Sequence, residues 1–205
     1  EPSEDAAAPE LPTPSVEAVA PEPTEADEQA ATKLLGMAGG TYRAGDHQAA
    51  KGFIEMLHRK YPGTQAQMMS GEIKRMLAIV DRPVPAAWES HVEEWFTPED
   101  GLQFDQGLVA VLFWEVWCPH CQQELPAWQK RYETFAPQGL QLVGFTQLSQ
   151  GATSEQVKDF ITEHQLTFPI GKEDGLMSTA NAVSNIPAAA VYKDGKVIFR
   201  GHPSL

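Results

Sequence analysis

The chain has 205 residues, of which 42% are hydrophobic, and its formal net charge is −13 at pH 7. This length allows one or two domains, and the acidic balance argues against a nucleic-acid partner, because phosphates attract basic surfaces. No apolar run approaches the roughly 20 residues that a membrane-spanning helix needs.

Residues 1–24 are rich in Pro, Ala and Glu. The prolines interrupt any helix and the acidic side chains repel one another, so we expect a disordered, extended tether. The chain begins at Glu1 rather than at Met, so we interpret it as processed or truncated and expect any signal peptide or lipid anchor to have been removed. The tether would hold the rest of the protein away from a membrane; a tail without a role is the alternative.

Residues 25–85 are expected to form a small all-α helical domain. Amphipathic stretches cover residues 25–44, 46–61 and 64–80, with apolar residues at helical spacing in the first two. Gly45-Asp46 is typical of a helix end followed by a new N-cap, and Pro62-Gly63 is typical of the end of the second helix.

The same stretch resembles a tetratricopeptide repeat. The matching positions are Tyr42, Gly45, Asp46, Ala49, Ala50, Phe53, Tyr61 and Pro62. The match covers little more than one repeat, whereas such arrays need about three for stability. We therefore expect these helices to lean on the following domain or to mediate a homodimer. Partner binding and a purely structural packing role remain open.

Pro83-Val84-Pro85 predicts a hinge, after which residues 86–205 form a second domain. We expect strands over 91–96, 108–115, 141–146, 189–192 and 196–200, and helices over 122–135, 154–164 and 177–183. Ser154 is the expected N-cap of its helix, and Asp194-Gly195 predicts a type I′ turn between the last two strands. This order predicts an α/β fold, a central mixed sheet flanked by helices.

The two cysteines of the chain stand in the segment Trp117-Cys118-Pro119-His120-Cys121. A strand before them and a helix after them would place Cys118 at a helix N-terminus, where backbone N–H groups and the helix dipole stabilise a thiolate. The motif predicts thiol–disulfide exchange, with Cys118 as the nucleophile and Cys121 as the residue that resolves the mixed disulfide. A zinc site normally needs four ligands, and no second Cys/His pair is present.

Residues 113–121 and their continuation, 122–126, resemble the active-site segment of thioredoxin-fold thiol:disulfide oxidoreductases, in particular the membrane-tethered TlpA/ResA type of bacteria. The resemblance covers roughly residues 88–202 and implies a thioredoxin-like fold. It implies a cis-proline at Pro187, after Ile186, facing the disulfide. It also implies that Glu124 shuttles the proton that Cys121 loses. It implies no dissociable cofactor and no metal.

Residues around the cysteines are expected to tune them. His120 would lower the pKa of Cys118, and the pair Pro119-His120 also resembles that of DsbA-type oxidases. Trp117 is the expected wall of the substrate surface. Glu115 is expected to face solvent, and electrostatic tuning of the sulfurs by its charge is the less favoured alternative.

The sequence departs from this family at three places. Leu112 stands where ordinary thioredoxins carry a buried carboxylate, and Ala188-Ala189-Ala190 lack a common threonine. The chain also stops at Leu205, where the last helix of the family would begin. We therefore expect that helix to be missing, with the helical domain covering one face of the sheet instead.

These features favour a TlpA/ResA-like reductase of the bacterial cell envelope. It would lie in the periplasm or on the outer face of the envelope, tethered to a membrane, and exchange disulfides with protein substrates and an envelope redox partner. A DsbA-like disulfide oxidase or isomerase is the first alternative. A non-enzymatic protein that docks partners through its helical domain is the second.

Overall fold

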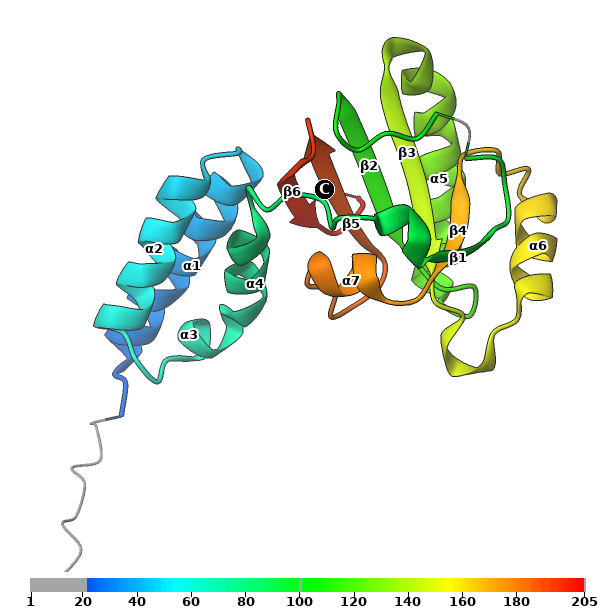
Figure 1. The fold of residues 1–205 in the computed structure, drawn as a ribbon. Helices are drawn as coiled ribbons and strands as arrows, with labels where there is room; N and C mark the ends of the chain where they lie inside the picture. Colours follow the sequence, from blue (N-terminus) through cyan, green and yellow to red (C-terminus); the bar gives the residue numbers. More distant parts are fainter. Residues whose placement is uncertain (1–21, 100, 205) are drawn as a thin grey trace, which may run out of the picture.

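The computed structural model describes residues 22–99 and 101–204 (Figure 1). The predicted tether falls largely on residues 1–21, which lie outside the described residues. Within the described ranges, no helix combines the length and the apolar character needed to cross a bilayer.

Four helices form the N-terminal unit: α1 (Glu25–Arg43), α2 (His47–Lys60), α3 (Gln65–Met69) and α4 (Gly71–Ile79). As predicted, Gly45 takes a positive φ of 81° after α1, and the Asp46 carboxylate accepts from the amide of Ala49 at 2.9 Å. Their buried side chains, mostly Ala, Ile and Leu, make a separate small core.

The single helix predicted over 64–80 is wrong, because it is broken into α3 and α4 at Ser70. The Ser70 hydroxyl donates to the carbonyl of Gln67 and lies 2.8 Å from Nε2 of His58, and the residue is fully buried. A serine that bonds nearby backbone competes with helical hydrogen bonding. The break follows from this competition.

Six strands form one sheet in the order β1-β4-β3-β2-β5-β6. Their bounds are β1 (Val92–Trp95), β2 (Leu108–Phe113), β3 (Leu140–Thr146), β4 (Ile170–Glu173), β5 (Ala188–Lys193) and β6 (Lys196–Gly201). The pairs β2/β3 and β3/β4 are parallel and the others antiparallel. The sheet is mixed, as predicted, but β4 was missed, since Ile170 is its single strong strand former.

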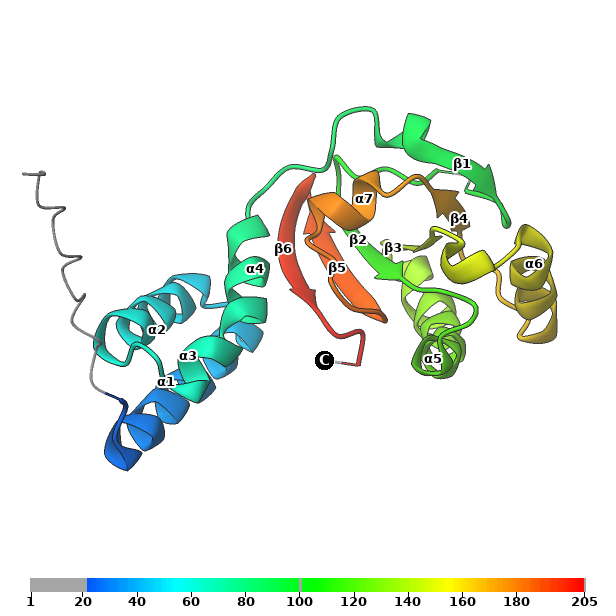
Figure 2. The ribbon, with the colours of Figure 1, turned by 90° about the horizontal axis from the view of Figure 1, so that it is seen from below.

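Helices cover both faces of the sheet (Figures 1 and 2). Helices α5 (Pro119–Phe135) and α6 (Ser154–Glu163) pack on one face, while α7 (Leu176–Ala180) and the 3₁₀ helix Trp88–His91 pack on the other. Strand β2 supplies both cores by alternation: Ala110 and Leu112 face α5, and Val109 and Val111 face α7. The C-terminal end of β2 therefore leads into the cysteine motif at the point where the two packed layers meet the sheet.

The N-cap of α6 is Thr153 rather than Ser154. The Thr153 hydroxyl accepts from the amide of Gln156, whose side-chain carbonyl accepts in return from the amide of Thr153. This reciprocal capping box satisfies two backbone donors that the helix itself leaves free. Ser154 instead donates its hydroxyl to Glu94 at 2.6 Å.

The segment predicted as a hinge is hydrogen-bonded to the sheet. Along the outer side of β6, the amide of Asp81 donates to the carbonyl of Val197, and the amide of Val84 donates to the carbonyl of Gly195, both at 2.8 Å. The amide of Val197 donates back to the carbonyl of Arg82 at 2.9 Å. Pro83, which has no N–H to offer, lies between the two donating residues.

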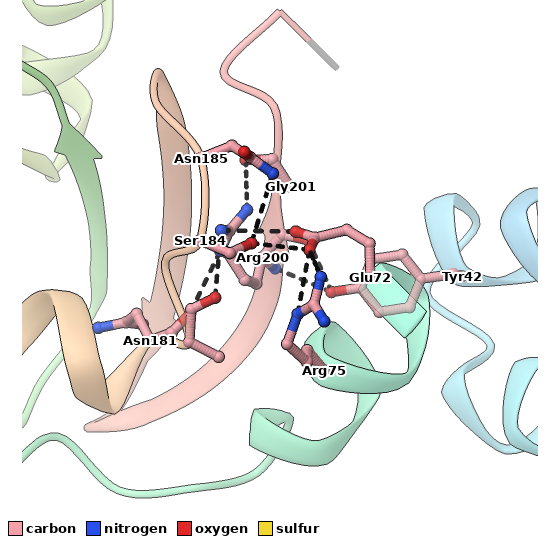
Figure 3. A network of polar contacts seen from close by, with 9 residues as sticks. Tyr42, Glu72, Arg75, Asn181, Ser184, Asn185, Arg200 and Gly201 are labelled. Atoms are coloured by element: carbon pink, nitrogen blue, oxygen red, sulfur yellow. Dashed lines mark hydrogen bonds and ion pairs between the residues drawn. The ribbon is translucent and has the colours of Figure 1, made fainter. Parts of the chain in front are cut away.

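The four helices pack against the second domain, as expected, but they lie beside the edge strand β6 instead of covering one face of the sheet, so that expectation is wrong (Figures 1 and 2). A polar network joins the two units (Figure 3). The Tyr42 hydroxyl donates to the carbonyl of Arg200 at 2.8 Å and accepts from its amide at 2.9 Å. The buried Arg200 guanidinium lies 3.6 Å from the Glu72 carboxylate. Glu72 also accepts from the hydroxyl of Ser184 at 2.9 Å, so α4 touches the loop that leads to Ile186.

Candidate redox active site

The two cysteines occupy the first turn of α5. Cys118 is the N-cap, and its Sγ accepts from the amide of Cys121 at 3.3 Å. Pro119 follows at the first helical position, where its missing N–H costs nothing. Cys118 is 5% exposed and Cys121 is fully buried. A helix N–H group therefore points at the sulfur nearer the surface, which is the arrangement that stabilises a thiolate.

The Cys121 thiol is strongly held in its protonated form. Burial is the main cause that raises the pKa of Cys121, and the hydrogen bond with Cys118 adds to it. The main chain of Glu115 lowers this pKa in part, while the charges of Cys118 and, to a smaller extent, Glu115 raise it. A protonated inner thiol and an outer sulfur facing a helix amide are two chemically distinct groups.

The residues between and before the cysteines lie near the surface. Pro119 and His120 are exposed, and Trp117 is 39% exposed with its Nε1 donating to Ser149 Oγ at 3.2 Å. The expected partial exposure of Trp117 is confirmed. Trp114, by contrast, is buried under α6, where its ring lies 5.8 Å from that of Phe160.

The peptide bond Ile186–Pro187 is cis, as the family resemblance implies. Pro187 is buried at the start of β5, and Ile186 is half-buried. Ile186 and Trp117 both line one cavity of about 230 Å³. The remaining lining is mixed: its polar members are Glu115, Gln147, Ser149, Ser178, Ser184 and Asn185, and its apolar members are Phe113, Trp114, Phe145 and Val183.

Glu124 lies on α5 one turn beyond Cys121. Its side chain is 18% exposed, and Oε2 lies 4.0 Å from Nη1 of Arg131. The described residues form no hydrogen bond between Glu124 and either sulfur. The structure therefore places this carboxylate on the cysteine-bearing helix with a cationic neighbour.

The expectation that Glu115 faces solvent is wrong. Glu115 is 5% exposed, and its carboxylate accepts from three donors, one at the end of β3 and two in the loop that follows it: Thr146 Oγ1 at 3.0 Å, the Gln147 amide at 3.0 Å and the Ser149 amide at 3.2 Å. These donors lie more than 30 residues away in the chain, so no local pattern revealed them. The one signal was position: Glu115 stands between the apolar residues Trp114 and Val116, directly before the motif.

Sequence reasoning also missed Glu173, a second buried carboxylate, 1% exposed. It accepts from the amides of Met177 and Ser178 at 2.7 and 3.0 Å, and thereby holds the start of α7. The side chain of Gln147 donates to Glu173 at 3.4 Å while the Gln147 amide donates to Glu115. Gln147 thus links the two carboxylates under the cavity. Across residues 22–99 and 101–204, no cluster of three or more His, Cys, Asp or Glu is arranged to hold a metal.

The chain is similar to several known proteins. Residues 101–198 match the AhpC/TSA family model. The thiol-disulfide oxidoreductase ResA of Bacillus thuringiensis subsp. konkukian (strain 97-27) is 28% identical over 88 residues, which are 42% of this chain and 49% of the relative. The sporulation thiol-disulfide oxidoreductase A of Bacillus subtilis (strain 168) is 38% identical over 58 residues, 28% of this chain and 35% of that protein. The chain thus spans about half or less of these relatives.

The fold of the chain is similar to that of a solved structure. The solution structure of a thioredoxin-like protein in the oxidized form superposes with a TM-score of 0.52 and 19% identity, covering 60% of this chain and 85% of the other. The sheet, its flanking helices and the cis-proline loop of this chain therefore make up a thioredoxin-like domain that matches the AhpC/TSA family model and resembles the thiol-disulfide oxidoreductases.

Proposed function

We propose that this protein is a thiol-disulfide oxidoreductase that acts on protein substrates at the bacterial cell envelope. The observation that carries the proposal is the placement of the two sulfurs: Cys118, which is 5% exposed, accepts at Sγ from a helix amide, and Cys121 is fully buried in the first turn of α5 with a raised pKa. The names of the relatives support the same chemistry.

The exchange divides the work between the two cysteines. As a thiolate, Cys118 attacks one sulfur of a substrate disulfide; that S–S bond breaks, a Cys118–substrate bond forms, and the other substrate sulfur leaves and takes up a proton. Cys121 then loses its proton and attacks Cys118 Sγ, which releases the second substrate thiol and leaves the Cys118–Cys121 disulfide. The substrate gains two electrons and two protons, and a dithiol of an envelope redox partner returns them to the pair.

The neighbouring residues serve this sequence of steps. Glu124 is the proposed acceptor of the Cys121 proton. Ile186 and Trp117 are the proposed walls for a substrate segment, with Pro187 behind them. No dissociable cofactor takes part, because the cysteine pair itself carries the electrons.

We assign the direction of exchange as that of a TlpA/ResA-like reductase, in line with the relatives' names. Pro119-His120 favours a second candidate, a DsbA-like oxidase or isomerase, because a cation near Cys118 stabilises the reduced thiolate and makes the disulfide more oxidising. A membrane tether at the N-terminus and a homodimer through α1–α4 are further proposals of the same scheme.

A trapping experiment tests the chemistry. A Cys121→Ala variant should accumulate mixed disulfides with envelope proteins, because the resolving thiol is gone, while Cys118→Ala should form none. Equal trapping by both variants, or by neither, would rule out the proposed exchange. Equilibration of the unmodified pair against glutathione gives the direction: about −270 mV indicates a reductase, and about −120 to −180 mV an oxidase or isomerase.

A further inference from the structure

The exchange described above gives no role to Glu115, the buried carboxylate between β2 and Cys118. An ionised group in a protein interior is costly unless partners compensate for its lost hydration. Glu115 has such partners, the Thr146 hydroxyl and the amides of Gln147 and Ser149. All three donate to its oxygens and replace part of the hydration that burial removes. The surroundings of the carboxylate therefore supply hydrogen-bond donors to both of its oxygens.

Glu115 is hydrogen-bonded to the loop that carries the cysteines. The carbonyl of Glu115 accepts from the amide of Cys118 at 3.1 Å. Its carboxylate accepts from the Ser149 amide, and the Ser149 hydroxyl in turn accepts from the Trp117 indole. Glu115 and Trp117 also line the same cavity. The main-chain bond to Cys118, the side-chain link through Ser149 and the shared cavity thus all place Glu115 beside the cysteine motif.

We propose that Glu115 is a positioning residue that sets the redox poise of the Cys118–Cys121 pair, its fixed negative charge making the pair a stronger reductant. The inference rests on the proposed exchange chemistry and deepens it.

The physical reason is an asymmetry between the two redox states. The disulfide is neutral, whereas the reduced pair carries a thiolate when Cys118 ionises. A nearby negative charge in a poorly hydrated site therefore disfavours the reduced, ionised form and leaves the disulfide almost unaffected. The effect of this charge on Cys121, whose pKa it raises, has the same sign.

The charge of Glu115 thus shifts the redox equilibrium of the cysteine pair in the direction opposite to that of Pro119-His120. His120, when cationic, stabilises the thiolate and pulls the pair toward oxidase behaviour. The carboxylate acts from the buried side of the loop, where water screens it less than it screens the exposed His120. On this basis the conflict between a reductase-like frame and an oxidase-like Pro119-His120 is decided by a residue just outside the motif.

The test compares the equilibrium between the full-length protein and glutathione at pH 7 for the wild type and Glu115→Gln. We expect the neutral variant to shift the equilibrium constant about tenfold toward the reduced dithiol, which corresponds to about 30 mV in the oxidising direction. The thiolate absorbance of Cys118 should titrate at lower pH in the same variant.

Further variants separate charge from loop geometry. Glu115→Ser is a second neutral replacement and should shift the constant in the same direction. Glu115→Asp keeps the charge, and Thr146→Val removes one supporting hydrogen bond but leaves the carboxylate; both should stay within about twofold of the wild type. An unchanged constant in the neutral variants, a shift toward the disulfide, or an equal shift in all four would overturn the inference. Absence of any exchange in the wild type would instead overturn the proposed function.

Discussion

At the scale of single residues, Tyr192 makes stability depend on pH in the alkaline range. It is 1% exposed, and burial raises its pKa to about 12, an effect that its hydrogen bond with Asn181 partly offsets. The ordinary value is 10.0. Between these two values the unfolded chain releases a proton that the folded chain keeps, so the free energy of unfolding falls as pH rises from about 10 to about 12.

Urea unfolding at pH 9, 10 and 11 checks this prediction. Tyr192→Phe should be less stable than the wild type at pH 9, because Asn181 loses its partner, and the difference should shrink as pH rises. A difference that stays constant over this range would show that Tyr192 does not cause the loss of stability.

Glu124 can be tested as the proton acceptor of Cys121. Glu124→Gln should slow the resolution of the mixed disulfide at least about tenfold, since a positioned general base typically contributes 10²–10⁴-fold. Rapid-quench measurement of that single step isolates it from substrate binding. The matched control is Glu133→Gln on the same helix, whose carboxylate accepts from Gln129 at 2.8 Å. Equal rates in the two variants would remove Glu124 from the mechanism.

At the scale of elements, two substitutions at the start of helix α6 test which residue caps it. Thr153→Ala removes the hydroxyl that accepts from the Gln156 amide and should lower the free energy of unfolding by about 1 kcal/mol. Ser154→Ala loses a bond to the carboxylate of Glu94 outside the helix and should change it by less than about 0.5 kcal/mol. Urea denaturation of both variants compares them directly, and a larger effect at Ser154 would reverse the assignment.

Elements with local signals were predictable from the sequence. The end of α1 and the start of α2 follow from Gly45-Asp46. The β5–β6 hairpin follows from Asp194-Gly195, because both of these turn residues take a positive φ. The strand–Cys–helix order likewise predicts the position of Cys118 at the N-terminus of α5. In each case the deciding interaction spans only a few residues.

Features that depend on distant partners were not predictable. Strand β4 is short and polar, and it forms because β1 and β3 flank it. Glu115 and Glu173 look like surface residues in the sequence, but donors from the loop after β3 and from α7 compensate for their burial. The buried Ser70 hydroxyl at the break between α3 and α4 also has a distant partner, His58 of α2. Tertiary partners outweighed local pattern at each of these positions.

At the scale of the whole molecule, the contact of Tyr42 with Arg200 couples the helical unit to the sheet. All five tryptophans lie in residues 86–205, so their fluorescence reports on the sheet unit, whereas far-ultraviolet circular dichroism also reports on α1–α4. We expect the two signals to change together during urea unfolding of the wild type. Tyr42→Phe leaves the amide and carbonyl of the buried Arg200 unpaired, at a cost of about 1–3 kcal/mol.

The two unfolding curves should therefore move to lower urea in Tyr42→Phe and separate from each other, with circular dichroism changing first. Tyr61→Phe, at the end of α2, is the control and should leave the curves superimposed. Separate curves in the wild type would mean that the two units unfold independently.

The pairing of residues 81–84 with β6 has a consequence for how molecules of this protein meet one another. A bare strand at the margin of a sheet offers unpaired N–H and C=O groups to any neighbouring chain and promotes aggregation. Here that margin is occupied by the chain's own connecting segment. The opposite margin, β1, is four residues long, irregular at Val92/Glu94 and acidic. A fragment beginning at Ala86 would uncover β6, and its weight-average mass, measured by light scattering, should rise more steeply with concentration than that of the longer chain.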